Sequence, residues 1–177
     1  MRMLEISPHL ALLEVPPEVL VAALVELEKT DTLHPSIQFS SHLNTRFLPK
    51  IAGNCIVNVK RLELSLTKCS NVPPELLGEA LVRIETVDLS YSEGRNNEDQ
   101  VSALFSKMAR SEEMKLLELE LTRVKISHIS PSIISEATVK LEKFNARECD
   151  LAVDQVSAIF TKLSTLKHHK LRILNSN

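Results

Sequence analysis

The sequence predicts an α/β protein in which short parallel strands alternate with helices in a curved array, with the sheet on the concave side and the helices on the convex side. Residues 141–151 carry apolar side chains at the spacing L-x-x-L-x-L-x-x-C-x-L, which is typical of a short strand followed by a turn. Strand cores of the type L-x-L recur at intervals of 25 to 32 residues. Two longer motifs recur at 55 and 57 residues, which indicates that two unlike units make up one long period.

Seven strand cores are expected, each with its outer residues buried and its middle residue on the opposite side of the sheet. They are Leu4–Ile6, Thr30–Thr32, Leu62–Leu64, Val87–Leu89, Leu117–Leu119, Phe144–Ala146 and Leu171–Ile173. The side chains expected to be nearly inaccessible are Leu62, Leu64, Leu89, Leu117 and Leu119. Thr30–Thr32 is the poorest core and is accepted because Asp31 aligns with Asp88 at the 57-residue interval. The polar stretch 34–44, which contains Pro35, is expected to form an irregular loop.

Helices are expected between the strands. The segment 15–20 recurs at 72–77 and more loosely at 129–134, and its prolines suit a first helical turn, where a backbone N–H has no intrahelical partner. The segment 99–107 recurs at 154–162, and both copies begin with acids that interact favourably with a helix N-terminus. The helix expected around residues 99–108 should have one apolar face, made by Val101, Leu104, Phe105 and Met108.

Composition sets the class of protein. The chain has 177 residues, a net charge of −2 and a pI of about 6.3, which suits one domain and argues against general binding to nucleic acid. No apolar stretch is long enough to span a membrane, and Glu5, Glu14 and Glu18 interrupt any signal peptide. The three cysteines lack CxxC spacing, so reduced thiols in a cytoplasmic protein are expected.

No catalytic site, metal site or cofactor is expected. The three glycines fall in no phosphate-binding motif, and the adjacent His168 and His169 would point apart on a helix or strand. Cys149 beside Asp150 has the residue types of a nucleophile next to an acid. The strand pattern already explains Cys149 as an inward-facing residue, so a protein that is not an enzyme is predicted.

The strand pattern, together with long units that carry true helices, resembles the ribonuclease-inhibitor-like class of leucine-rich repeat proteins. The resemblance covers nearly the whole chain and implies a solenoid of about six units, a curved horseshoe segment forming a single domain over residues 1–177. It also implies protein–protein recognition, with an immune-type receptor, a ubiquitin ligase or a scaffold as contexts. Neither end carries a usual capping element, so either the array continues or a partner copy covers the ends.

The middle residues of the strand cores should line the concave face, and most of them are acidic. They are Glu5, Asp31, Glu63, Asp88, Glu118, Asn145 and Arg172, and Glu120 adds another acid. Neighbouring strands lie about 4.8 Å apart, so a ladder of carboxylates is expected, and like charges at this spacing lower stability. Protection of the sheet from aggregation is one explanation, and docking of a basic protein partner is the other. The two explanations are compatible.

Regulation of a small GTPase, as a GTPase-activating protein, is the alternative function. Some leucine-rich repeat proteins accelerate GTP hydrolysis on a bound GTPase through a positioned arginine, a role that Arg147 or Arg123 could take here. The predicted partner-binding residues are therefore Glu5, Asp31, Glu63, Asp88, Glu118, Glu120, Asn145 and Arg147.

Overall fold

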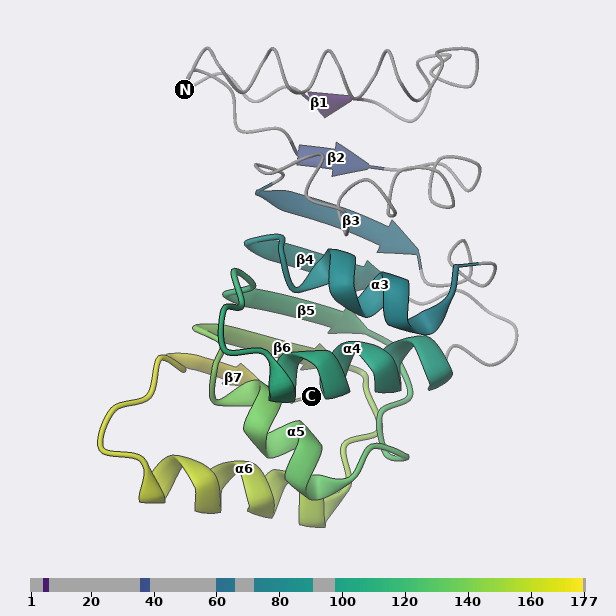
Figure 1. Cartoon of the computed structure of the whole chain (residues 1–177). Coiled ribbons are helices and arrows are strands. Elements are labelled where there is room, and N and C mark those ends of the chain that lie inside the picture. The colour runs from purple at the N-terminus through teal and green to yellow at the C-terminus, as the bar shows by residue number, and fades with distance from the viewer. Residues whose placement is uncertain (1–4, 7–35, 39–59, 66–71, 91–97, 177) are drawn as a thin grey trace.

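Seven strands form one parallel sheet in the order β1-β2-β3-β4-β5-β6-β7, so each strand pairs with its neighbours along the chain (Figure 1). The computed structural model describes residues 5–6, 36–38, 60–65, 72–90 and 98–176. The strands are β1 (Glu5–Ile6), β2 (Ser36–Gln38), β3 (Arg61–Ser65), β4 (Thr86–Ser90), β5 (Glu118–Thr122), β6 (Lys143–Arg147) and β7 (Ile173–Asn175). The predicted α/β class with a parallel sheet is confirmed.

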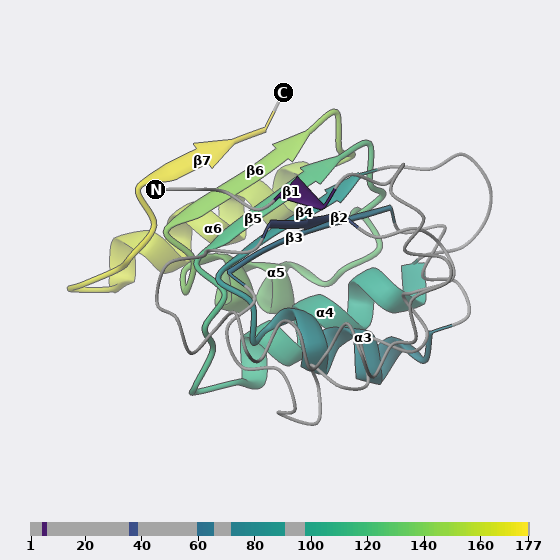
Figure 2. The ribbon, with the colours of Figure 1, turned by 90° about the horizontal axis from the view of Figure 1, so that it is seen from above.

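The described helices are α3 (Pro74–Leu81), α4 (Glu98–Arg110), α5 (Pro131–Thr138) and α6 (Val153–Thr165). Figures 1 and 2 show them together on one side of the sheet. Within the described part of the chain, no helix or strand covers the other side, which is called the open face below. The protein therefore has a helical layer, a sheet and an apolar core between them.

Alternate residues of β3 to β6 build this core. Leu62, Val87, Leu119 and Phe144 are in register across the four strands and are fully buried. A second buried row lies two residues further along each strand and consists of Leu64, Leu89, Leu121 and Ala146. Burial of each large aliphatic side chain stabilises the fold by roughly 1.5–3 kcal/mol, so these rows fix the register of the sheet.

The helices repeat at the intervals that the sequence predicts. α3 and α5 each have eight residues and lie 57 residues apart, and both have proline in the first turn. α4 and α6 each have thirteen residues and lie 55 residues apart. The predicted apolar face of α4 is confirmed, because Val101, Leu104, Phe105 and Met108 are buried. The helix expected from Pro16 lies outside the described residues, as do Cys55 and Cys69.

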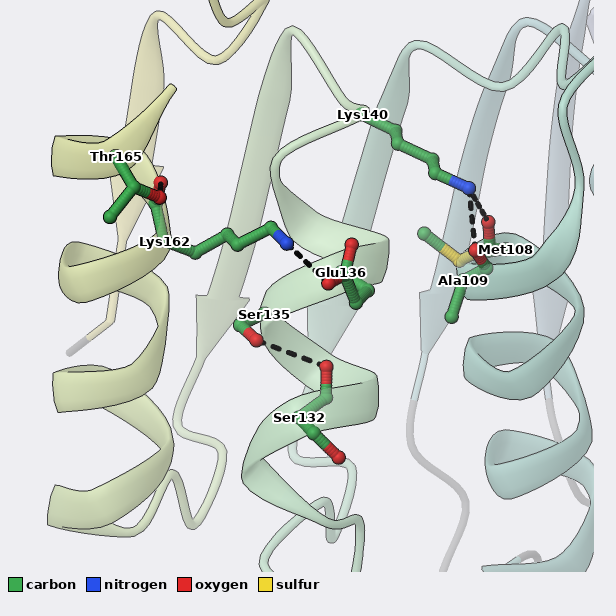
Figure 3. A network of polar contacts seen from close by, with 8 residues as sticks. All are labelled: Met108, Ala109, Ser132, Ser135, Glu136, Lys140, Lys162 and Thr165. Carbon is green, nitrogen blue, oxygen red and sulfur yellow. Dashed lines mark hydrogen bonds and ion pairs between the residues drawn. The ribbon is translucent and has the colours of Figure 1, made fainter.

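Lysine side chains form polar contacts between neighbouring helices, and two of these contacts are at equivalent positions of the repeat. Lys107 forms an ion pair with Glu79 at 3.0 Å, and Lys162 forms the corresponding pair with Glu136 (Figure 3). The Nζ of Lys140 donates hydrogen bonds to the carbonyl oxygens of Met108, Ala109 and Ser111, at 3.0, 2.6 and 2.9 Å. These carbonyls lie at or just past the C-terminus of α4, where a cation interacts favourably with the helix dipole.

Two predictions near the N-terminus, one of a strand and one of a loop, have different outcomes. Thr30–Thr32 lies outside the described residues, and so does Asp31. The irregular loop expected over residues 34–44 is wrong at Ser36–Gln38, because this segment is β2 and pairs with both β1 and β3. The register places Ile37 between Ile6 and Leu62. A single apolar residue between polar neighbours satisfies the two-residue period of a strand but not the L-x-L pattern.

The expected register of β5 is wrong by two residues, and that of β7 is wrong by three. Leu117 precedes β5 and is only half-buried, whereas Leu119 and Leu121 are buried. The segment 117–121 contains two overlapping L-x-L cores, and pairing with Val87 and Phe144 selects the second. In β7, Leu174 is in register with Phe144, so Ile173 lies in the alternate row and is 44% exposed, contrary to its expected core position.

Candidate functional site

The open face is lined by the strand residues that alternate with the buried rows. Glu63, Asp88 and Glu120 are in register on β3, β4 and β5, and they are called the acidic row below. Asn145 on β6 continues the same row. All four side chains are half-buried, because each lies between neighbours on adjacent strands. The predicted ladder of acids is therefore present at its centre, with Glu120 rather than Glu118 beside Asp88.

The other predicted residues lie elsewhere. Glu118 is in the neighbouring row, in register with Thr86 on β4 and Lys143 on β6. The backbone of Glu5 is in register with Ser36, which pairs with Arg61 and therefore belongs to this neighbouring row. The expected alignment of Glu5, Glu118 and Arg172 with Asp88 is wrong. Arg172 precedes β7 and is exposed, and Asn175 occupies the position next to Asn145.

Two basic residues missed by the sequence analysis flank the acidic row. Arg61 Nε lies 3.2 Å from Glu63 Oε1 on the same strand. Lys143 Nζ lies 2.5 Å from Glu120 Oε1 on the adjacent strand, and this hydrogen bond is the main cause that raises the pKa of Lys143. Arg61 is two residues before Glu63, and Lys143 is two residues before Asn145. The two-residue period of a strand therefore places both basic residues on the open face and would have identified them.

Asp88 is the central residue of the acidic row and differs from the two outer acids. Within the described part of the chain, its carboxylate has no hydrogen-bond or ion-pair partner. Burial raises the pKa of Asp88, and the negative charges of Glu120 and Glu63 raise it further, against smaller opposite effects of Arg61 and Lys143. The centre of the row is therefore a carboxylate that a cation from outside the sheet would stabilise.

The strand ends form a separate polar rim. Arg123 and Glu148 directly follow β5 and β6, and both adopt positive φ angles, 57° and 53°. Arg123 Nε lies 2.6 Å from Glu148 Oε2, and Arg147 Nε lies 3.5 Å from Glu148 Oε1. The hydrogen bond from Arg123 is the main cause that lowers the pKa of Glu148. Arg147, a predicted partner-binding residue, thus lies at the edge of the open face and outside the acidic row.

Asp150 ties the segment after β6 to the segment after β5. Its Oδ1 accepts hydrogen bonds from the N–H groups of Ile126 and Ser127, at 2.6 and 3.2 Å, and its Oδ2 accepts one from Ser127 Oγ at 2.5 Å. Partial burial raises the pKa of Asp150, but these hydrogen bonds outweigh burial and leave the pKa below its ordinary value. These contacts give Asp150 a structural role.

Gln155 supports the same connection from inside the protein. Its side chain is buried, and Nε2 donates to the carbonyl oxygens of Ile126 and Ile129 at 2.8 and 2.6 Å. The Oε1 atom accepts a hydrogen bond from the N–H of Ala152. Cys149 packs against the core nearby, and burial is the main cause that raises the pKa of its thiol, which makes the thiolate less available. Cys149 contacts the core as expected, but it is only half-buried.

The residues that the structure describes include no group of three or more His, Cys, Asp or Glu side chains able to hold a metal ion. In the same residues, no helix has the length and apolar character needed to cross a membrane. His168 and His169 are both exposed. Comparison of the chain with protein-family models, with curated proteins and with solved structures finds no match.

Proposed function

We propose that the chain is a leucine-rich repeat protein that recognises a basic protein partner on its open face, without catalysis. Two features support the assignment to this family. Strands and helices alternate from β3 to β7 in a parallel sheet ordered along the chain. Helices of equal length recur at 55 and 57 residues, as expected for units that stack on one another.

The observation that carries the proposed function is the position of Asp88 between Glu63 and Glu120. Arg61 and Lys143 already neutralise the two outer acids, whereas Asp88 is half-buried and has no cation partner among the described residues. A lysine or arginine of a partner placed over Asp88 would form a charge-assisted hydrogen bond and relieve the repulsion along the row.

Protection from aggregation explains why the open face is charged, but it does not explain why three carboxylates lie side by side. Any exposed charge on the sheet discourages edge and face pairing, and Arg61 and Lys143 serve that purpose as well as an acid does. A third carboxylate between two others adds repulsion without adding protection, because like charges on adjacent strands are destabilising. A recognition surface benefits from such a carboxylate, since the cation that satisfies it then comes from the partner.

A matched pair of charge-reversed variants tests the proposal. The first variant replaces Glu63, Asp88 and Glu120 by Lys. The second replaces three exposed acids that lie outside the open face, Glu75, Glu112 and Glu113, by Lys. Immobilised wild-type chain and both variants are exposed to extract from the native cells, and the retained proteins are identified.

The proposal predicts that the first variant loses a basic protein that the wild type and the second variant both retain. Raised salt should weaken retention by the wild type, because exposed charges are screened beyond about 8 Å at physiological ionic strength. Equal loss in both variants, or retention by the first variant, would place the binding site elsewhere.

The alternative role as a regulator of a small GTPase gains no specific support. Arg123 and Arg147 both contact Glu148, which holds them along the rim. Two surface grooves lie between α3 and α4 and between α5 and α6, and neither is lined by these arginines. The GTPase role stays a prediction, which a GTP hydrolysis assay of Arg123→Ala and Arg147→Ala variants with a bound GTPase would test.

A further inference from the structure

The segment that joins α6 to β7, residues 166–172, is strongly basic and is called the basic loop below. It contains no acid, and its basic side chains are all exposed; they are Lys167, His168, His169, Lys170 and Arg172. Asp154 is the only acid in residues 153–176, although the whole chain has a net charge of −2. Positive charge is therefore concentrated at this end of the described structure.

The equivalent loop after α4 has the opposite charge. At the 55-residue interval, Lys167 and His168 correspond to Glu112 and Glu113, which are also exposed. The two loops enter the sheet in the same way, because the equivalent residues Leu116 and Leu171 are both buried. The repeat itself therefore does not require a basic loop at this place.

The outer side of α6 directly precedes the basic loop and is apolar. It carries Val153, Val156, Phe160 and Leu163, which are called the α6 face below. Val153 is 87% exposed and Phe160 is 59% exposed. Figure 1 shows α6 as the outermost of the described helices, and Figures 1 and 2 show the basic loop projecting from the same end of the molecule.

The charged side chains of α6 lie on the other side of the helix. Asp154 and Lys162 line the groove between α5 and α6. Figure 3 shows Lys162 directed toward α5, where it forms an ion pair with Glu136. The α6 face therefore carries no acid, and the lysines of the basic loop follow it directly.

This combination fits the surface of a membrane that contains anionic lipids. A helix with an apolar side, no acid on that side and lysines beside it binds at the boundary between headgroups and acyl chains. Each lysine near such a surface adds electrostatic attraction. A nucleic acid would satisfy the lysines but would leave Val153 and Leu163 in water. A further strand–helix unit would cover the α6 face, but the loop after α4 shows that such a neighbour does not need a basic loop.

We propose that the α6 face and the basic loop together form a docking surface for membranes that contain anionic lipids. Val153 and Phe160 enter the headgroup region, and Lys167 and Lys170 contact the anionic headgroups. The open face lies on the opposite side of the sheet from α6, so docking leaves the acidic row accessible (Figure 2). The proposal uses none of the residues of the proposed function and is independent of it.

Flotation of the full chain with lipid vesicles tests the electrostatic part of the proposal. The wild type should bind vesicles of phosphatidylcholine mixed with phosphatidylserine more tightly than vesicles of phosphatidylcholine alone, and raised salt should weaken this binding. Replacing Lys167 and Lys170 by Gln should weaken it by about 30-fold, because two attractive charges are lost at the surface. The matched control replaces Lys115 and Lys125, which are exposed elsewhere, by Gln and should bind nearly as the wild type does.

A second pair of variants tests the apolar part. Phe160→Ser should weaken binding to the vesicles that contain phosphatidylserine by about tenfold or more, since it removes a large apolar side chain from the contact. Ile173→Ser removes an exposed apolar side chain from the open face and should leave binding unchanged. Circular dichroism verifies that all variants fold.

Four results would overturn the proposal. They are a wild type that does not bind the anionic vesicles, equal binding to both kinds of vesicle, equal losses in the two lysine variants, and unchanged binding of Phe160→Ser. A wild type that ignores vesicles but binds single-stranded RNA through Lys167 and Lys170 would also overturn it, because the partner would then be a nucleic acid.

Discussion

Helices α4 and α6 share a nine-residue motif that differs at only two positions and have opposite surroundings. Phe105 of α4 is fully buried, and Phe160 at the equivalent position of α6 is 59% exposed. The inner side chains agree better, because Leu104 and Ile159 are each 1% exposed. The motif therefore determines a thirteen-residue helix and the side that faces the sheet. Burial of the other apolar side depends on the neighbour, which is α5 for α4.

The largest expected effect separates these two phenylalanines. Phe105→Ala should lower the free energy of unfolding by about 3–5 kcal/mol, because it leaves a cavity in a close-packed core. Phe160→Ala should change it by less than about 0.5 kcal/mol, because the side chain is largely exposed. Urea denaturation followed by circular dichroism measures both values. Similar losses for the two variants would mean that Phe160 is covered within a single copy.

The next effect concerns the C-terminal ends of the same helices. Lys140→Met keeps most of the side-chain volume but removes three hydrogen bonds from the end of α4, and it should lower stability by about 1–2 kcal/mol. Thr165→Val removes one hydrogen bond from the exposed end of α6 and should lower stability by about 0.5 kcal/mol or less. Thermal unfolding of the two variants compares the ends directly. A larger loss for Thr165→Val would contradict this account of the helix ends.

Asp150 extends the comparison to the segments after β5 and β6, because it joins them. Its folded pKa is lowered, so its contribution to stability is present above the unfolded pKa near 3.8 and is lost as pH falls through the folded pKa. Asp150→Asn should lower stability at neutral pH by about 1 kcal/mol or less, since the group is largely solvated. Urea denaturation at several pH values should show this difference shrinking below pH 3.8. A difference that grows in acid would reverse the predicted sign.

The smallest effect contrasts the two sides of the sheet. Asp88 has a raised folded pKa, so the stability linked to its protonation is present below pH 3.8 and is lost as pH rises through the folded pKa. At neutral pH, Asp88→Asn should therefore raise the free energy of unfolding, by a few tenths of a kcal/mol and at most about 1 kcal/mol. Every core variant should lower it. A destabilised Asp88→Asn variant would show that the carboxylate supports the fold.

Much of the fold follows from local periodicity in the sequence. Strands β3, β4 and β6 and helices α4 and α6 are predicted correctly, because their apolar residues recur with strand or helix spacing. Strand β5 is displaced because Leu117 and Leu121 both satisfy the pattern around Leu119. The choice between them depends on pairing with Val87 and Phe144, which is a contact distant in sequence.

The candidate site is predicted in part for the same reason. The acids of the open face follow from strand alternation, which predicts Glu63, Asp88 and Glu120 among them. Arg61 pairs with Glu63 on the same strand. The neutralisation of Glu120 depends on which side chains meet across strands, because Lys143 reaches Glu120 diagonally. Only the register of the sheet distinguishes Asp88, which lacks a cation partner among the described residues, from its paired neighbours.

The most direct test of the proposed function is the association rate of the basic partner isolated with the wild-type chain. Surface plasmon resonance should show slower association for the variant with Glu63, Asp88 and Glu120 replaced by Lys, with a smaller change in dissociation, as expected when charge guides the encounter. The control variant at Glu75, Glu112 and Glu113 should associate at nearly the wild-type rate. Unchanged association of the open-face variant, or equal slowing of both variants, would contradict recognition on the open face of the sheet.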